Sequence, residues 1–120
     1  MTNVVWVDVT VRSGVAVSDF VQVPNKGIGG EYAVCAVALP ADIDGTVGGI
    51  EWSFDGTTVY APLTSAGAAL TFTIADAASS KNGLVMLDPV NFSITLPYFR
   101  FYMGTNATAD RTYKVGFRKV

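Results

Sequence analysis

Hydrophobic and polar residues alternate with a period of two along much of this chain, and that pattern predicts β-strands. In residues 49–63 (GIEWSFDGTTVYAPL), the alternation runs from Ile50 to Phe54, as expected of a half-buried strand. Asp55 and Gly56 follow, and both residue types tolerate the positive φ that tight turns need. Because the alternation resumes after the turn, this stretch predicts two strands joined by a bend at its Asp-Gly tip.

Similar stretches recur along the chain with turn signals between them, and none has the periodicity of an amphipathic helix. We therefore expect an all-β protein: an antiparallel β-sandwich of about eight strands, of the jelly-roll or immunoglobulin-like type. A length of 120 residues favours a single domain over residues 1–120. Outside the Asp-Gly hairpin, strands are expected over residues 4–12, 15–23, 31–39, 68–75, 84–87, 94–103 and 112–120.

The low content of charged residues leads us to expect that the protein binds partners. Charged residues make up 15% of the chain, whereas about 25% is typical of soluble domains. A surface with so few charges is poorly protected against association, so we expect a homo-oligomer; the alternative is a monomer covered by Thr, Ser and Gly. No apolar run approaches the roughly 18 residues that a membrane span needs, so no membrane partner is expected.

The missing residue types exclude several chemistries. Histidine is absent and Cys35 is the only cysteine, which excludes Ser-His-Asp triads, Cys-His pairs, zinc sites of the usual kind and internal disulfides. Cys35 lies among apolar residues and is expected to be a small core residue. Glu31 and Glu51, the only glutamates, both fall on predicted strands, where a solvent-facing role is sufficient. We therefore predict no enzyme activity, no catalytic residue and no cofactor.

A metal site is not expected either. Asp42-x-Asp44-Gly45 resembles the start of an EF-hand calcium loop, but the closing glutamate is missing because Glu51 already lies within a strand. A surface turn is the preferred interpretation. The alternative is a carboxylate-poor calcium site shared with Asp55.

Charge is unevenly distributed along the chain. Residues 100–120 carry a net charge of +4, so the remainder carries −6. This asymmetry favours contact between oppositely charged parts of neighbouring copies, or with an acidic neighbour. Nucleic acid is not expected as a partner, because the overall pI is about 4.8.

The aromatic residues divide into two groups, according to the face of the strand to which their side chains should point. In the predicted strand over residues 94–103, two tyrosines and an arginine share one parity and should project outward together. Trp52, Phe54, Phe99 and Phe101 are expected to fill the core. Tyrosine and arginine are common at binding hot spots, so the outward residues are candidates for protein contact, together with basic residues near the C-terminus. The predicted protein-contact residues are Tyr98, Arg100, Tyr102, Arg118 and Lys119.

Three motifs occur in an order that resembles a known group of proteins. SFDGTTVYAPL, LDPVNF and YFRFYMGTNATADRTYKVGFRKV follow one another over roughly the C-terminal two-thirds of the chain. This order resembles small virion proteins of tailed bacteriophages, including capsid decoration or cement proteins. The resemblance implies a β-sandwich without catalysis that is made in the host cytoplasm and binds the major capsid protein or its own copies at the capsid surface. It transfers no functional residue.

The Asp-Gly hairpin also resembles turns in discoidin-like and other carbohydrate-binding sandwiches. This resemblance implies an alternative function, a carbohydrate-binding module of a phage fibre or surface protein. The glycan-contact residues would then be Trp52, Asp55 and Tyr60, close to the hairpin tip.

Overall fold

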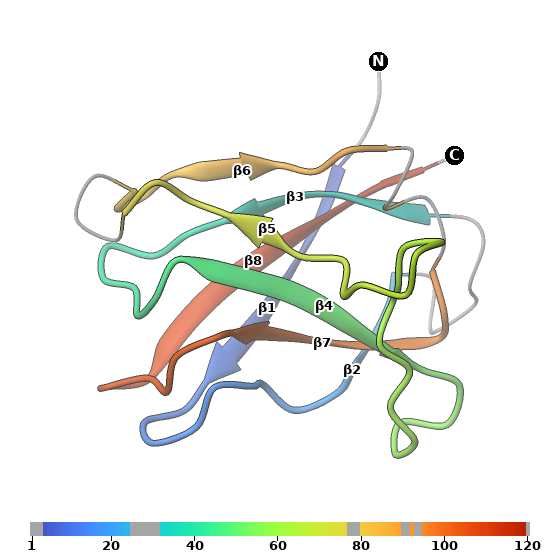
Figure 1. Cartoon of the computed structure of the whole chain (residues 1–120), viewed down its shortest axis with the longest axis horizontal. Coiled ribbons are helices and arrows are strands. Elements are labelled where there is room, and N and C mark those ends of the chain that lie inside the picture. Colours follow the sequence, from blue (N-terminus) through green and yellow to red (C-terminus); the bar gives the residue numbers. More distant parts are fainter. Residues whose placement is uncertain (1–3, 25–31, 77–79, 90–91, 93–94, 120) are drawn as a thin grey trace.

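In the computed structural model, the chain forms two four-stranded antiparallel sheets that pack face to face (Figure 1). The structure describes residues 4–24, 32–76, 80–89, 92 and 95–119, and these residues form no helix. The predicted all-β sandwich is therefore confirmed. Sheet A contains, in spatial order, β1 (Val4–Val11), β8 (Arg111–Lys119), β3 (Tyr32–Ala38) and β6 (Leu84–Met86). Sheet B contains β2 (Val21–Gln22), β7 (Tyr98–Met103), β4 (Val47–Ser53) and β5 (Phe72–Thr73).

The pairing of the strands explains their order. The first strand pairs with the last, β2 with β7, β3 with β6, and β4 with β5. These four pairs make one long hairpin, with β1–β4 in one arm and β5–β8 in the other. The hairpin is rolled up so that β3 also pairs with β8 and β4 also pairs with β7. The resulting orders, β1-β8-β3-β6 and β2-β7-β4-β5, are those of an eight-stranded jelly roll. Of the two predicted sandwich types, the strand order selects the jelly roll.

Alternating side chains of the two sheets meet to form one hydrophobic core. Phe99 and Phe101 of β7 are completely buried, and they face Phe117 and Tyr113 of β8. The ring centroids lie 5.0 Å apart for Phe99 and Phe117 and 4.5 Å apart for Phe101 and Tyr113. Full burial of one large apolar side chain contributes roughly 1.5–3 kcal/mol, so these two central strands hold the sheets together.

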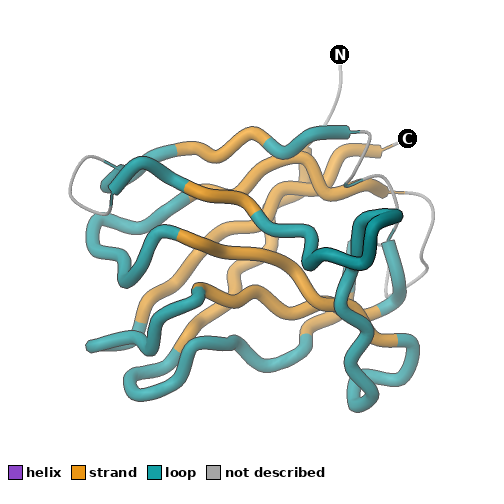
Figure 2. The backbone as a smooth tube through the Cα atoms, viewed as in Figure 1, coloured by secondary structure: helices purple, strands orange, loops and turns teal. Residues whose placement is uncertain are grey.

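Some predicted strands are shorter in the structure than in the prediction. The second arm of the Asp-Gly hairpin is reduced to one bridge, in which the backbones of Trp52 and Tyr60 exchange hydrogen bonds of 3.0 and 2.8 Å. Pro62 has no N–H to continue the ladder, and the chain forms a long loop before β5 (Figure 2). The predicted strand over residues 15–23 is likewise reduced to a bridge at Val17 and the short β2.

Successive strands run in opposite directions, so the connections alternate between two ends of the sandwich. We call these the left end and the right end, as they appear in Figure 1. The left end holds the connections β1–β2, β3–β4, β5–β6 and β7–β8. The right end holds the connections β2–β3, β4–β5 and β6–β7.

Candidate interaction surfaces

The outer face of sheet B carries the row of side chains that the sequence predicts for β7. Tyr98, Arg100 and Tyr102 alternate with buried neighbours, and each is partly exposed. The register with β4 places Arg100 opposite Glu51 and Tyr102 opposite Gly49. The predicted outward direction of these three residues is confirmed, whereas their role in binding stays a prediction.

The side chains of this row lie against their own sheet. Arg100 Nη2 is 2.8 Å from Glu51 Oε1, and the guanidinium lies 4.8 Å from the centroid of the Phe20 ring. The Tyr102 ring covers Gly49, where a β-carbon would come within 2.5 Å of the Tyr102 hydroxyl. Burial, and secondarily the Glu51 carboxylate, raise the pKa of Tyr102. The row is therefore preorganised, and a partner that bound it would immobilise few additional side chains.

Arg118 and Lys119 do not join this row. Both are exposed at the end of β8 in sheet A, where Arg118 lies between Val4 of β1 and Ala33 of β3. Arg118 has the parity of the residues on the outer face of sheet A, which points away from sheet B. The five residues predicted as protein contacts therefore do not form one surface, and Lys119 follows Arg118 with the opposite side-chain direction at the strand end.

Asp55 is engaged in its own turn. Its Oδ1 atom accepts hydrogen bonds from the backbone N–H groups of Thr57 and Thr58, both at 2.9 Å, and from Ser53 Oγ at 3.0 Å. These hydrogen bonds, led by the one from Thr58, lower the pKa of Asp55 to about 2. Gly56 supplies the positive φ, 82°, that the turn requires. The Asp-Gly tip is a bend. The carboxylate of Asp55, which was predicted to contact a glycan, instead accepts hydrogen bonds within this bend.

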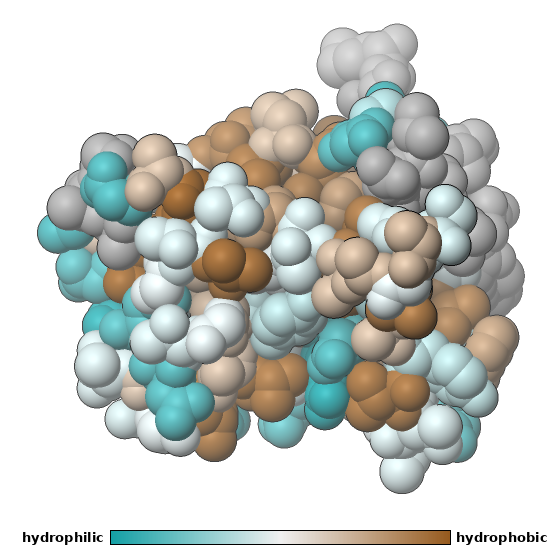
Figure 3. All heavy atoms as spheres, in the orientation of Figure 1, coloured by the Kyte–Doolittle hydropathy of each residue, from teal (hydrophilic) through white to brown (hydrophobic). Residues whose placement is uncertain are grey.

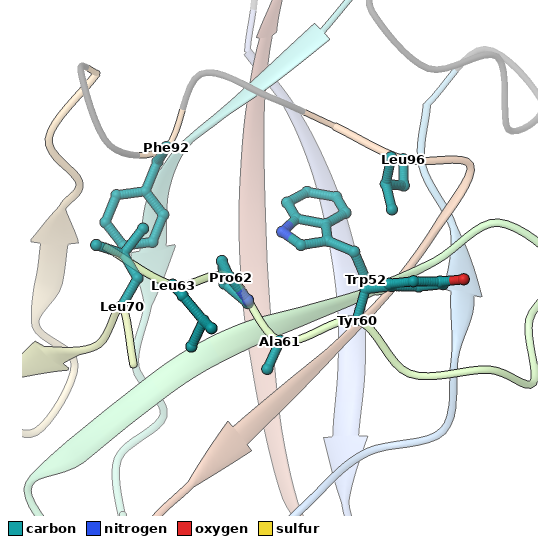
Figure 4. Close-up of a pocket in the computed structure, with 8 residues that line it drawn as sticks. All are labelled: Trp52, Tyr60, Ala61, Pro62, Leu63, Leu70, Phe92 and Leu96. Atoms are coloured by element: carbon teal, nitrogen blue, oxygen red, sulfur yellow. The ribbon is translucent and has the colours of Figure 1, made fainter. Parts of the chain in front are cut away.

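An apolar pocket of about 300 Å³ opens near this turn at the right end (Figure 4). Trp52 in its wall is only 8% exposed, whereas Tyr60 is 49% exposed and directs its hydroxyl away from the other labelled side chains. Two of the three predicted glycan-contact residues thus meet in one pocket, and Asp55 does not line it. The lining residues are Trp52, Tyr60, Ala61, Pro62, Leu63, Leu70, Phe92 and Leu96.

Exposed apolar side chains cluster beside this pocket in the β4–β5 connection. Phe54, Val59, Tyr60 and Leu63 are 61%, 40%, 49% and 60% exposed, and we call them the loop patch. The Phe54 and Tyr60 rings pack edge to face with their centroids 5.4 Å apart. The prediction that Phe54 fills the core is wrong, because β4 ends at Ser53 and the strand alternation ends with it. Apolar residues lie over this connection in the right half of Figure 3.

The outer face of sheet A carries a second apolar surface, which the sequence interpretation did not single out. Trp6, Leu84 and Met86 are 42%, 56% and 71% exposed. The register places Trp6, Gly116, Ala36 and Met86 in one row across the four strands, and the Trp6 ring covers Gly116. The alternation within β1 could have predicted this surface, because it directs the Trp6 side chain to the face opposite the core-facing valines.

Cys35 lies on β3 but not in the core. The pairing of β3 with β8 shifts register between Val34 and Ala36, so a bulge forms at Cys35 and leaves it half-buried. Its Sγ lies 3.5 Å from the Gly116 carbonyl oxygen, to which the thiol donates. Burial raises the pKa of this thiol, although Arg118 opposes the effect. The prediction that Cys35 is a small core residue is therefore wrong.

The carboxylate of Asp44 ties loops together at the left end. Asp44 Oδ2 accepts a hydrogen bond of 2.9 Å from Arg111 Nε, and Oδ1 accepts one of 3.0 Å from Thr108 Oγ1. The hydrogen bond from Arg111 is the main reason that the pKa of Asp44 is lowered. Gly45 follows with a φ of 82°, as a turn requires. The surface turn is the better interpretation, since Asp55 lies at the opposite end and no three potential metal ligands gather among the described residues.

The described residues include no helix that is long and apolar enough to cross a membrane. The loop patch and the outer face of sheet A instead expose apolar side chains that the fold does not bury. No protein-family model, curated protein or solved structure matches the chain significantly.

Proposed function

We propose that the protein is a structural virion protein of a tailed bacteriophage. It decorates and cements the head by binding the major capsid protein at the capsid surface, without catalysis. The observation that carries the proposal is the exposed apolar surface: eleven large hydrophobic side chains among the described residues are more than a third exposed. Isolated exposed hydrophobic residues are common, but clusters of them are typical of interaction sites. The resemblance of the C-terminal motifs to virion proteins supplies the capsid as the partner.

The loop patch and the β7 row form the surface that suits the capsid best. Tyr98 packs against Gly56 of the Asp-Gly turn, so the row of Tyr98, Arg100 and Tyr102 runs into the β4–β5 connection. A concave apolar pocket next to a polar and aromatic surface is the usual environment of a binding hot spot. We therefore assign the right end and the outer face of sheet B to the capsid. Arg118 on sheet A is left for a second neighbour.

Decoration of a lattice requires only complementary surfaces. An interface of standard size buries about 1,600 Å², and a protein on a capsid meets several neighbours at once. Linked contacts multiply through effective concentration, so each single contact can be weak. The absence of histidine from the chain is compatible with this function, because no proton transfer is needed.

The test is the binding of purified protein to capsids assembled without it. Leu63→Ser removes an exposed leucine of the loop patch, and the double variant Arg100→Ala/Tyr102→Ala removes the centre of the row. Each should weaken capsid binding at least about tenfold, because truncation of a hot-spot residue costs about 2 kcal/mol or more. Bound copies are counted after co-sedimentation with the capsids.

Leu84→Ser is the matched control, because Leu84 is 56% exposed, close to the 60% of Leu63, but lies on sheet A. Its capsid occupancy should equal that of the unaltered protein. Undiminished occupancy of both the Leu63→Ser protein and the double variant contradicts the proposal.

The pocket favours one second candidate, a carbohydrate-binding module. Trp52 and Tyr60 could stack on a sugar ring, as aromatic side chains with a polar group often do at binding surfaces. However, Trp52 and Tyr60 are also the only described lining residues with polar side-chain atoms, and a sugar needs several hydrogen-bonding partners. A glycan array tests this candidate: binding that Tyr60→Ala abolishes supports it, and an array without signal above background excludes it.

A further inference from the structure

We propose that the outer edge of β1 pairs with β1 of a second copy, so that two jelly rolls share one continuous sheet across a two-fold axis. The partner is therefore another molecule of this chain, and the contact is a ladder of main-chain hydrogen bonds. The proposal does not depend on capsid binding, because the surface assigned to the capsid lies on sheet B and at the right end.

β1 is unlike the other edge strands of the described sheets. The two sheets have four edges, formed by β1, β6, β2 and β5. β2 and β5 contain two residues each and β6 contains three, whereas β1 contains eight. Natural proteins shorten, charge or cover edge strands, because a row of unpaired N–H and C=O groups is a template for another strand. Three edges of this fold follow that rule by being short, whereas β1 is long and carries a single charged residue, Asp8.

The outer edge of β1 pairs with no other strand among the described residues. β1 pairs with β8 from Val4 to Val11, and no other described residue forms a backbone hydrogen bond with it. Its sequence, VVWVDVTV, is rich in β-branched residues and contains no proline, glycine or lysine that would discourage pairing. Val4, Val5 and Trp6 are 39%, 38% and 42% exposed, so a neighbouring strand would also cover apolar side chains.

Two-fold symmetry limits the register of such a pair. In a continuous sheet the outer faces of both copies lie on the same side. Two directly opposed residues must therefore point to the same face, which means that their residue numbers are both odd or both even. Two registers keep the longest overlap: one centred on Val7, which pairs residues 4–10 of both copies, and one centred on Asp8, which pairs residues 5–11. Centring on Asp8 would place two carboxylates directly opposite, which is destabilising. Centring on Val7 places Asp8 opposite the partner subunit's Trp6 instead.

The register centred on Val7 leaves the existing ion pair of β1 intact. Asp8 Oδ1 lies 2.8 Å from Lys114 Nζ on β8, which is on the opposite side of β1 from the proposed partner. Val7 then faces the partner subunit's Val7 on the inner side of the sheet. The like charges of the two copies are thereby kept apart.

The proposed contact produces a dimer and no larger assembly. Under two-fold symmetry the same edge is used by both molecules, and the remaining edges are too short to propagate the sheet into a fibre. One strand pair with its exposed side chains is small beside the roughly 1,200–2,000 Å² of a stable interface. The dimer should therefore dissociate on dilution.

A matched pair of charge variants tests both the dimer and its register. Trp6→Glu and Trp6→Lys remove the same indole, and each places its new charge opposite the partner subunit's Asp8. Sedimentation velocity of the full chain over a concentration series at low salt should show a dimer for the unaltered protein. The Trp6→Lys dimer should be about tenfold tighter than the Trp6→Glu dimer, because each dimer contains two such cross-strand charge pairs. The difference should shrink at high salt, which screens exposed charges.

Cross-linking gives a second readout that does not depend on charge. In a Cys35→Ser background, Val7→Cys places two thiols opposite each other, where the Cα atoms of paired strands lie about 4.5–5.5 Å apart, within disulfide range. Mild oxidation should convert this variant to a covalent dimer. Thr10→Cys is the control, because position 10 faces the partner subunit's Val4 and its thiol should stay reduced.

Three results overturn the proposal: a single protomer mass at every concentration, equal dissociation of the two folded Trp6 variants, or cross-linking of Thr10→Cys as readily as Val7→Cys. Thermal melting of each variant shows that it is folded. An intact dimer without capsid binding contradicts only the proposed function, whereas capsid binding by a permanent monomer contradicts only the β1 dimer.

Discussion

The two ends of the jelly roll are closed by different forces. At the left end, charged side chains link separate connections: Asp44 with Arg111, at 2.9 Å, and Asp42 with Lys81, at 3.5 Å. The backbone N–H of Gly14 adds a 2.8 Å hydrogen bond to the connection between β7 and β8. The loops of the left end therefore satisfy one another's polar groups.

The right end is closed by apolar packing instead. None of the four ion pairs between described residues lies there. The hydrogen bonds of Asp55 stay within its own turn and join no second connection. Apolar side chains from the β4–β5 and β6–β7 connections, such as Leu70 and Phe92, close this end and leave the pocket between them.

This difference separates the part of the molecule that ties the fold together from the part that is proposed to bind partners. Hydrogen bonds and ion pairs are specific for their partners, and at the left end they are made between the connections of the fold itself. Apolar closure is less specific, and at the right end it leaves Phe54 and Leu63 about 60% exposed. Variants of the two ends should therefore change different properties, stability at the left end and association at the right.

The largest effect on stability is expected from Asp44→Ala. This variant removes the acceptor for Arg111 and Thr108 and should lower the free energy of unfolding by about 2 kcal/mol, a typical loss for hydrogen bonds to a charged group. Urea unfolding measures the change. Asp42→Ala is the matched control, since its ion pair with Lys81 is more than half exposed and should contribute no more than about 0.5 kcal/mol. Equal losses in both variants would show that the left end is not held by Asp44.

A smaller, pH-dependent effect is expected at the Asp-Gly turn of the right end. The turn lowers the pKa of Asp55 from 3.8 to about 2, so folding favours the carboxylate. Its stabilising contribution is complete above about pH 5 and is lost as the pH falls through the folded-state value. The stability difference between the unaltered protein and Asp55→Asn should therefore shrink between about pH 5 and pH 2. A difference that stays constant over this range, measured by urea unfolding at each pH, would contradict the assignment of Asp55 to the turn.

The smallest effect on stability is expected from Phe54→Ser in the loop patch. Because Phe54 is 61% exposed, the change should alter the free energy of unfolding by no more than about 0.5 kcal/mol. The same variant should reduce capsid occupancy, because it removes apolar contact surface. A loss of stability as large as that of Asp44→Ala would mean that the right end is part of the folding core, and the contrast between the ends would fail.

Much of the core and one of the surfaces could be predicted from the alternation of residues. The buried faces of β7 and β8, and the outward row of Tyr98, Arg100 and Tyr102, follow from the fixed direction of side chains along a strand. The exposure of Phe54 could not be predicted, since it depends on where β4 ends. The pocket could not be predicted either, because Phe92 and Leu70 reach it from separate connections.

The sequence by itself determined that the chain is all-β, which residues of its longest strands face inward, and that Asp55 and Gly56 form a bend. These properties are local, because they depend on the backbone geometry of a few consecutive residues. Only the tertiary structure decided that the strands form a jelly roll, that β1 is an edge strand of its sheet, and that Arg118 lies on the other sheet from Arg100. Pairing such as that of Val4 with Arg118 joins opposite ends of the chain, and its free energy comes from contacts that no local pattern contains.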